Sequence, residues 1–432
     1  MSASPSPIAP TAADAHVATA PAPALSGPPL TSSAIAINLV IAAMLMLATL
    51  PGRTQGLGLI TEPLLADVGL DKVKYADLNL WATLGGGLLC LPVGFLIDRL
   101  GLRAVAVALL LGLGVTVWRL AEIGSGYWTL FTLILLTRAF GQSGLSVVSI
   151  SAASAAAQRR YGMMMGIYGV VLTVFFFAAF GALKATIPVY GWRTNWLWIA
   201  GILIVVMAPI ILLFLRASPR VAAGWAPATA PSAAVAPPPG GRTLSQALAT
   251  PTFWVFAVAV SLYGLVSSGL GLFAQAVLSE RGLEPSAMFD FYQYGGIALL
   301  AGQGLCTLLA MRFPLNRLLT VAMVAYAAAL ALMPLISGLG LFYVFTALSG
   351  LSGGIIAVLF YAVWKPAFGT LQLGRIQGAA QLLTVVFSAL GPEVLERCHV
   401  LTGSYTPVLS VLAVAVTVLG IVAWRVRLPT MA

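Results

Sequence analysis

The stretch that decides the fold is Gly94-Phe95-Leu96-Ile97-Asp98-Arg99-Leu100-Gly101-Leu102-Arg103, a short charged turn between two long apolar segments. Gly101 permits a tight turn, because glycine adopts backbone conformations that other residues avoid. Gly94 allows neighbouring helices to approach closely, and Asp98 can pair with a cation or with the N-terminus of a neighbouring helix. On both sides of this turn, apolar segments long enough to cross a bilayer follow one another along the chain.

The composition excludes an ordinary soluble protein. Of the 432 residues, 60% are hydrophobic and 8% are charged, whereas soluble domains carry roughly 25% charged residues. The net charge is +10, but the cations stand singly at the ends of apolar segments, so nucleic acid is not an expected partner. Cys90, Cys306 and Cys398 show no metal-ligand spacing, and we expect no metal or other cofactor.

About twelve apolar segments have the length that a membrane-spanning helix needs, which is about 20 residues. We predict them at 34–58, 76–97, 104–122, 127–156, 162–187, 194–216, 252–279, 289–311, 317–337, 340–364, 376–396 and 405–425. The expected fold class is therefore an all-α membrane protein with about 12 transmembrane helices, surrounded by lipid.

An Ala/Pro-rich segment at 217–250 has the composition of a flexible linker and divides the spans into two sets of six, at 34–216 and 251–428. The segment 308–317 follows span eight at the place where 94–103 follows span two. Duplicated halves imply pseudo-two-fold symmetry, with a substrate site between the halves near the membrane midplane. Residues 1–33, which contain no Lys or Arg, are expected to form a disordered tail rather than a signal peptide.

Lys and Arg are unevenly divided between the two sides of the predicted bundle. Twelve follow the even-numbered spans: Arg99, Arg103, Arg159, Arg160, Arg216, Arg220, Arg242, Arg312, Arg317, Arg375, Arg425 and Arg427. Five follow the odd-numbered spans: Lys72, Lys74, Arg193, Arg281 and Arg397. By the positive-inside rule, both termini and the linker face the cytoplasm, and we expect a bacterial inner membrane or a membrane derived from it.

Two arginines, Arg53 and Arg138, lie inside predicted spans and away from their ends. Arg138, in span four, costs at least ~2.5–3.5 kcal/mol on insertion scales. Arg53 is followed by Thr54 and Gln55, at a point where Pro51 and two glycines allow span one to unwind or bend. Arg138 can instead pair with a neighbouring polar group, and Arg53 can instead extend to the outer interface. We favour cavity-facing positions for both, and an anionic substrate, because no nearby span-centre carboxylate neutralises them.

Glu62 and Glu393 are the carboxylates closest to the spans. Each can bind a coupling proton or pair with an arginine, so protons are a candidate second solute. The alternative for each is an interfacial residue on the outer surface.

The turn at 94–103 resembles the G-x-L-x-D-R-x-G-x-R loop of the major facilitator superfamily. Arg138-Ala139-Phe140-Gly141-Gln142-Ser143-Gly144 is similar to that superfamily's fourth-helix motif, whose arginine is linked to substrate binding or proton coupling. The resemblance implies a secondary transporter that works by rocker-switch alternating access, and we expect a monomer. It also implies a gating role for the turn residues Gly94, Asp98, Arg99, Gly101 and Arg103.

A narrower resemblance concerns the second half. Thr250-Pro251-Thr252-Phe253-Trp254 and Leu373-Gly374-Arg375-Ile376-Gln377-Gly378 look like segments of the monocarboxylate and oxalate–formate porters, which carry small organic anions with a proton or by exchange. Such relatives often place a basic residue in span eight or eleven, where this chain has Gln381. Gln381 is therefore a neutral candidate for substrate contact, and a dicarboxylate clamp built from both halves is not expected.

Three functions remain open at this point. The favoured one is a secondary transporter of a small organic anion, in which Arg53, Arg138, Gln55 and Gln381 contact the substrate. The alternatives are an inorganic-ion or iron-linked permease, as in the magnetosome members of the superfamily, and a non-transporting membrane scaffold. The sequence contains no H-E-x-x-H, G-x-S-x-G or phosphate-loop motif, so an enzyme is not expected.

Overall fold

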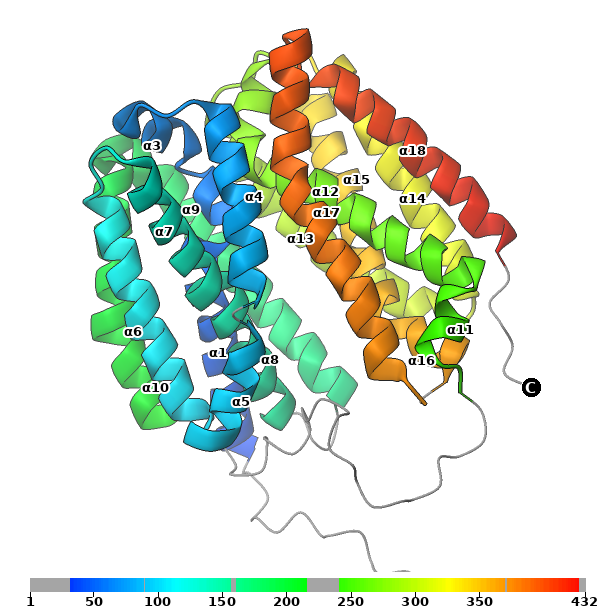
Figure 1. The fold of residues 1–432 in the computed structure, drawn as a ribbon, viewed down its shortest axis with the longest axis horizontal. Coiled ribbons are helices and arrows are strands. Elements are labelled where there is room, and N and C mark those ends of the chain that lie inside the picture. Colours follow the sequence, from blue (N-terminus) through cyan, green and yellow to red (C-terminus); the bar gives the residue numbers. More distant parts are fainter. Residues whose placement is uncertain (1–31, 89, 157–160, 216–240, 370, 427–432) are drawn as a thin grey trace, which may run out of the picture.

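The computed structural model describes residues 32–88, 90–156, 161–215, 241–369 and 371–426, and within these ranges every regular element is a helix. The helices form two groups that stand side by side, one from α1 to α10 and one from α11 to α18 (Figure 1). The predicted tail, most of the predicted linker and the side chain of Asp98 lie outside the described part. The proposed domain boundaries therefore stay predictions.

The first group contains α1 (Ser32–Ala48), η1 (Leu50–Gly52), α2 (Thr54–Gly58), α3 (Thr61–Val68), α4 (Lys72–Leu88), α5 (Cys90–Leu100), α6 (Leu102–Ala121), α7 (Tyr127–Thr137), η2 (Arg138–Leu145), α8 (Ser146–Ala156), α9 (Tyr161–Gly201), η3 (Ile202–Met207) and α10 (Ala208–Phe214). The second contains α11 (Leu244–Leu248), α12 (Pro251–Ser279), α13 (Ala287–Leu309), α14 (Leu315–Leu332), η5 (Met333–Leu335), α15 (Leu339–Ala362), α16 (Trp364–Phe368), α17 (Leu373–Thr402) and α18 (Thr406–Arg425).

Ten helices in the described part are long and apolar enough to cross a membrane. One of them, Gly166–Phe214, has 49 residues, more than twice the ~20 that one crossing needs. Gly191 breaks it at φ 77°, so it forms two crossings. The helix α13 has 23 residues but carries Asp290, Gln293 and Gln303, which lower its hydropathy. With these two additions, twelve segments of the described residues span the bundle, in agreement with the number that the sequence predicts.

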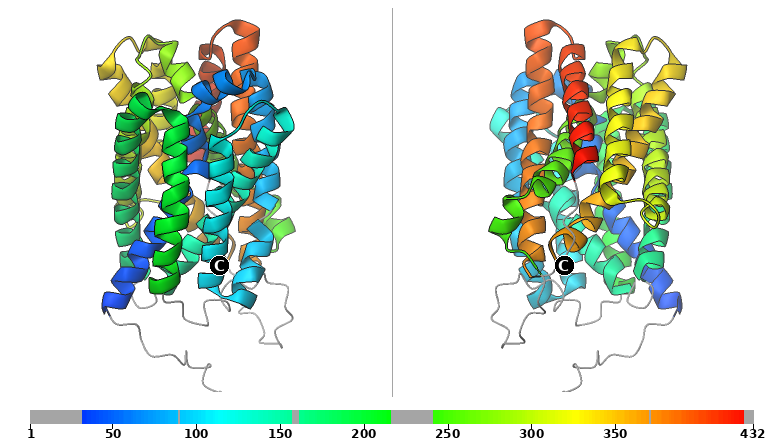
Figure 2. Two further views of the ribbon diagram at one scale, coloured as in Figure 1. Left: turned by 90° about the vertical axis from the view of Figure 1, so that its left-hand side faces the viewer. Right: turned by 90° about the vertical axis from the view of Figure 1, so that its right-hand side faces the viewer.

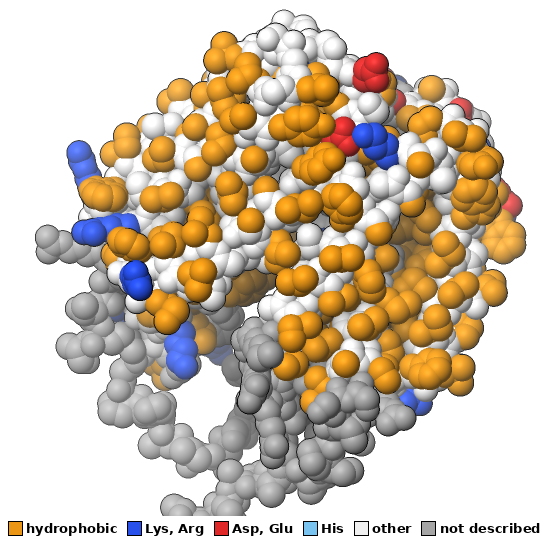
Figure 3. Space-filling view, turned by 180° about the vertical axis from the view of Figure 1, so that it is seen from behind, with side chains coloured by type: hydrophobic (Ala, Val, Ile, Leu, Met, Phe, Trp, Pro, Cys, Tyr) orange, Lys and Arg blue, Asp and Glu red, His pale blue; other side chains and the backbone are white. Residues whose placement is uncertain are grey.

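The two sides of the bundle are distinguished by their turns. We call lower the side where α1 begins, where α5 turns into α6 and where α11 and α16 lie, and upper the side of α3 and of the α17–α18 turn (Figures 1 and 2). Gly101, between α5 and α6, has φ 84°, which confirms the glycine-dependent turn. Hydrophobic side chains cover most of the face seen in Figure 3, as a lipid-facing surface requires.

The two groups of helices meet mainly towards the upper side. Their principal contacts join α4 to α17, α9 to α13, and α12 to α2 and α3. The lower-side helices α5 and α8 make their principal contacts within their own group. At the upper end of α2, a Cβ on Gly58 would stand 2.1 Å from the carbonyl oxygen of Gly271 in α12. The two backbones therefore pack so closely that only glycine fits at position 58.

This contact generates a prediction about the closed upper side. Gly58→Val should force α2 away from α12 and lengthen the distance between spin labels placed at Ala66 and Val400, measured by double electron–electron resonance in a variant whose native cysteines are replaced. Gly304→Val is the matched control, because nothing lies within 4 Å of a Cβ at Gly304. An unchanged label distance in Gly58→Val would contradict the role assigned to this contact.

Candidate functional site

A cavity with two arms lies between the two groups of helices. Its aromatic arm has a volume of about 290 Å³ and its polar arm about 170 Å³. Both arms are lined by Arg53, Gln55, Tyr263 and Ser267. The polar arm adds Thr54, Thr83, Gln142, Gly264, Ser268 and Ser388. The aromatic arm adds Leu172, Thr173, Phe176, Phe177, Phe180, Leu270, Phe291, Tyr292, Gln293, Gly295, Gly296, Leu299, Tyr326, Thr346, Ser349 and Gly350.

A break in the first span brings Arg53 to the junction of the two arms. The α-helix stops at Ala48, and Arg53 adopts an extended backbone at φ −85°, ψ 154° before α2 begins. Gly52 allows the break to press against span four, because a Cβ there would stand 2.0 Å from the carbonyl oxygen of Thr137. The predicted bend at Pro51 and Gly52 is therefore confirmed.

The Arg53 guanidinium is held by neutral groups. Its Nε donates to Thr49 Oγ1 at 2.5 Å, and its Nη2 lies 2.7 Å from the sulfur of Met46 and 3.4 Å from Ser146 Oγ. Its Cζ is 5.9 Å from the centre of the Phe176 ring, within range of a cation–π contact. Among the described residues, no carboxylate lies within ion-pair distance of Arg53, and none lines either arm of the cavity.

Arg138 lies behind the wall of the cavity and lines neither arm. Its side chain is 2% exposed. One nitrogen, Nη1, donates to Thr54 Oγ1 at 2.8 Å and to Gln142 Oε1 at 2.5 Å, while Nη2 donates to Asn79 Oδ1 at 2.9 Å. Arg138 thus ties together α2, α4 and η2, and its partners Thr54 and Gln142 themselves line the polar arm.

The segment that carries Arg138 is wound unusually. From Arg138 to Leu145 the backbone forms a π-helix, a rare conformation that is frequent at functional sites. Gly86 of α4 makes room for it, since a Cβ at that position would stand 2.7 Å from Cβ of Arg138.

The two glutamines of the predicted site are separated. Gln55 lines both arms of the cavity. Gln381 in α17 is exposed and is not among the residues that line either arm.

The predicted gating residues lie at the lower side. Arg103 donates from Nε and Nη2 to the carbonyl oxygen of Leu215 at 2.9 and 2.6 Å, which fixes the α5–α6 turn to the end of α10. Arg99 stacks over the Phe95 ring at 4.1 Å, and Gly94 is buried. These contacts join parts of one group of helices. Among the described residues, the α5–α6 turn makes no principal contact with the other group of helices.

The carboxylates proposed for coupling lie towards the upper side. Glu62 in α3 pairs with Lys72 at 2.6 Å. Glu393 in α17 is 7% exposed and pairs with Arg397 through Oε1, while its buried Oε2 has no hydrogen-bond partner.

An ion pair joins the two groups of helices, and it was not predicted from the sequence. Lys184 in α9 lies 2.6 Å from Asp290 in α13. Beside it, Gln293 donates to the carbonyl oxygen of Phe177 at 3.0 Å, and the rings of Phe180 and Tyr292 stack at 5.3 Å. The sequence signal was a lysine and an aspartate near the ends of two spans, and only their juxtaposition shows that they pair.

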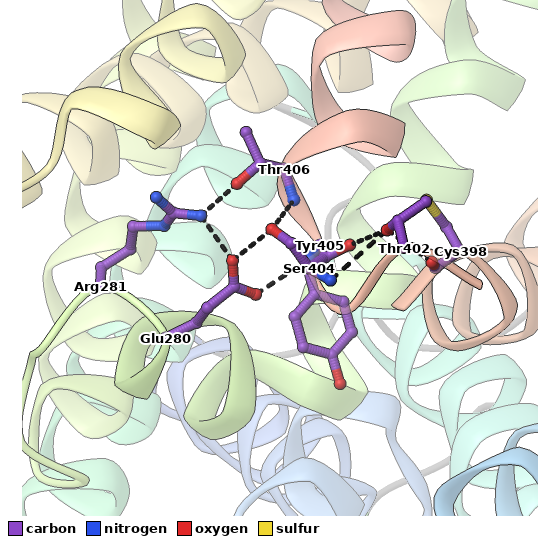
Figure 4. Close-up of polar contacts among 7 residues, drawn as sticks. All are labelled: Glu280, Arg281, Cys398, Thr402, Ser404, Tyr405 and Thr406. Carbon is purple, nitrogen blue, oxygen red and sulfur yellow. Dashed lines mark hydrogen bonds and ion pairs between the residues drawn. The ribbon is translucent and has the colours of Figure 1, made fainter. Parts of the chain in front are cut away.

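A second polar cluster closes the α17–α18 turn at the upper side (Figure 4). The Glu280 carboxylate accepts hydrogen bonds from Ser404 Oγ and the Tyr405 backbone, and pairs with Arg281. Burial raises the pKa of Glu280, but these hydrogen bonds and the nearby charges outweigh it, so that the net pKa is lowered. Burial and the hydrogen bond to Glu396 raise the pKa of Tyr405.

An upper cavity of about 430 Å³ borders this cluster. It is lined by Glu62, Lys72, Gln275, Ala276, Ser279, Glu280, His399 and Tyr405. The described residues contain no group of three His, Cys, Asp or Glu side chains arranged to hold a metal ion.

Comparisons with known proteins place the chain in a family. The family model described as Major Facilitator Superfamily matches residues 33–392. A search of curated proteins found no relative with significant sequence similarity.

Similar solved structures agree with that match. A bacterial homologue of the human lysosomal transporter Spinster, in an inward-facing and unoccupied conformation, superposes with a TM-score of 0.64 at 16% identity, covering 91% of this chain and 96% of the other. The nucleoside transporter NupG superposes with a TM-score of 0.67 at 14% identity, covering 90% of this chain and 98% of the other. The protein is therefore a multi-pass membrane transporter, not an enzyme, and it belongs to the major facilitator superfamily.

Proposed function

We propose that the protein moves a small organic anion across the membrane by rocker-switch alternating access. The observation that carries this proposal is the Arg53 guanidinium at the cavity wall, where no described carboxylate lies within ion-pair distance. An uncompensated charge in a membrane-spanning bundle is costly. An anionic substrate group would supply the missing charge, whereas a neutral solute such as a nucleoside would not.

The arrangement of the two halves supports alternating access. The principal contacts between them include the Gly58–Gly271 approach and the Lys184–Asp290 pair, both towards the upper side. The cavity lies between the halves, and α5 and α8 at the lower side make no principal contact with the opposite half. Rocking the halves about the cavity would close the lower side and open the upper side.

The distribution of charge supports an orientation. In Figure 3 most Lys and Arg side chains gather along the lower and left edges, and Asp and Glu side chains in the upper right. By the positive-inside rule the lower side would face the cytoplasm, and the membrane would be a bacterial inner membrane or one derived from it.

The two arginines differ in the role that we assign to them. Arg53 would bind the anionic group directly. Arg138, buried behind the wall, would act as a positioning residue that holds Thr54 and Gln142 in the polar arm. Gln55 would contribute a neutral contact beside Arg53.

An inorganic-ion or iron-linked permease and a scaffold are the other candidates. Sixteen residues beyond the shared junction line the aromatic arm, and most of them are apolar or aromatic. Such a wall suits an organic solute better than a hydrated inorganic ion, because ion sites present oxygen or charged ligands. A scaffold would have no need of a cavity at all.

For the proposed transport, the first prediction concerns Arg53. Arg53→Gln should raise the half-saturation concentration for carboxylate uptake into proteoliposomes by at least about tenfold, because a hydrogen bond to a charged group contributes about 1.5–3 kcal/mol. Arg53→Lys should retain part of the affinity. Wild-type uptake by Arg53→Gln would exclude direct anion binding by this residue.

The second prediction concerns Arg138. Arg138→Ala should lower the thermal unfolding temperature more than Arg53→Ala does, because it leaves the buried Thr54 and Asn79 and the partly buried Gln142 without this donor, at up to about 1–3 kcal/mol each. Tryptophan fluorescence during heating measures this difference. Arg138→Lys keeps the positive charge. If it recovers the uptake that Arg138→Ala loses, the loss reflects the positioning of cavity side chains and not a failure to fold. Equal stability of the two alanine variants would contradict the assignment.

The third prediction concerns proton coupling. If Glu393 takes up the coupling proton on its unpartnered buried oxygen, Glu393→Gln should remove the stimulation of uptake by an inward pH gradient and leave substrate exchange intact. Glu122→Gln is the control, since that side chain is about half exposed at 49%. Persistent stimulation in Glu393→Gln would leave Glu62 as the remaining candidate.

A further inference from the structure

The two arms of the cavity differ in chemistry. The polar arm presents the hydroxyl groups of Thr54, Thr83, Ser268 and Ser388. The aromatic arm, at about 290 Å³, is the larger, and Leu, Phe and Tyr make up half of the residues that line it. A small hydrophilic anion would need only the polar arm and Arg53. The aromatic arm therefore indicates that the solute has a second, apolar part.

The wall of the aromatic arm is already organised for a flat ring. Phe180 and Tyr292 stack with ring centres 5.3 Å apart, and the ring centre of Phe176 lies 5.9 Å from that of Phe180. Phe291 stacks on Phe345 with an angle of 14° between the rings. Aromatic side chains in fixed stacks offer large apolar faces with little rotamer entropy to lose on binding.

The junction of the arms sets the shape of the ligand. Arg53 lines both arms, and its guanidinium carbon is 5.9 Å from the centre of the Phe176 ring. An anionic group bound to Arg53 thus has the aromatic wall as its immediate neighbour. A short chain of atoms between the anionic group and the apolar part of the ligand is enough for the ligand to reach from one arm into the other.

We propose, resting on the anion transport proposed above, that the substrate is an amphipathic organic anion of the arylalkyl-carboxylate class. Its carboxylate binds Arg53 at the junction, and its ring fills the aromatic arm. Phe176 comes from α9 and Phe291 from α13, so the ring contacts both halves of the transporter and binds best when they are closed around it.

The test uses Gly296 in α13, which lines the aromatic arm. Nothing lies within 4 Å of a Cβ built on Gly296, so a leucine there can occupy the arm without displacing its neighbours. Gly304→Leu, on the same helix and equally unobstructed, is the matched control outside the cavity. Initial uptake rates of 3-phenylpropanoate, propanoate and the neutral 3-phenylpropanamide are measured in proteoliposomes, with protein-free liposomes as the background.

In the wild type, 3-phenylpropanoate should half-saturate uptake at a concentration at least about tenfold below that of propanoate, because burial of a ring adds apolar area. The amide should show no saturable uptake. Gly296→Leu should abolish the preference for the aryl acid by raising its half-saturation concentration towards that of propanoate, and Gly304→Leu should behave as the wild type. Equal half-saturation by both acids, or an intact preference in Gly296→Leu, would overturn this inference alone. Absence of saturable uptake of either acid would overturn the proposed anion transport itself.

Discussion

An arginine charge inside a membrane-spanning bundle must be compensated, and the structure around the cavity depends on how this is done. The charge of Arg138 is stabilised, without a described carboxylate to cancel it, by hydrogen bonds to three neutral side chains from α2, α4 and η2. Those bonds hold the first, second and fourth spans together behind the cavity. Arg53 has weaker contacts, including a sulfur atom and an aromatic ring, and lies at the cavity wall. The cost of an arginine charge in the membrane thus makes Arg138 a structural residue and Arg53 a candidate binding residue.

The halves are joined by contacts of two kinds. The approach of Gly58 to Gly271 places two backbones together without interlocking side chains. Between α9 and α13, the Lys184–Asp290 pair, the hydrogen bond from Gln293 to Phe177 and the Phe180–Tyr292 stack add side-chain contacts. Surfaces of small residues can separate and return without repacking a core. Contacts between small residues suit a transporter that rocks between two states, whereas the side-chain contacts between α9 and α13 would have to break for the upper side to open.

Long apolar segments, the turn at Gly101 and the break at Pro51-Gly52 could all be predicted from the sequence, because length, hydropathy and glycine content act locally. The position of Arg138 behind the wall could not, since it depends on the rotation of span four and on the π-helical winding of 138–145. Nor could the pairing of Lys184 with Asp290, which joins residues 106 positions apart. The aromatic arm was missed because its phenylalanines resemble any lipid-facing or core residues until the halves are placed together.

The extended residue between η1 and α2 also has an electrical consequence. Arg53 sits within the membrane, so its positive charge would move with its half through part of the transmembrane field. A bound monovalent anion would cancel that charge, so the loaded carrier would move one positive charge fewer through the field than the empty carrier. The empty carrier would have to move the bare charge against or with the field, at up to about 2.3 kcal/mol per 100 mV for a full crossing. Under the proposed function, membrane voltage would therefore act more strongly on the return of the empty carrier than on the movement of the loaded one, which favours exchange of one anion for another.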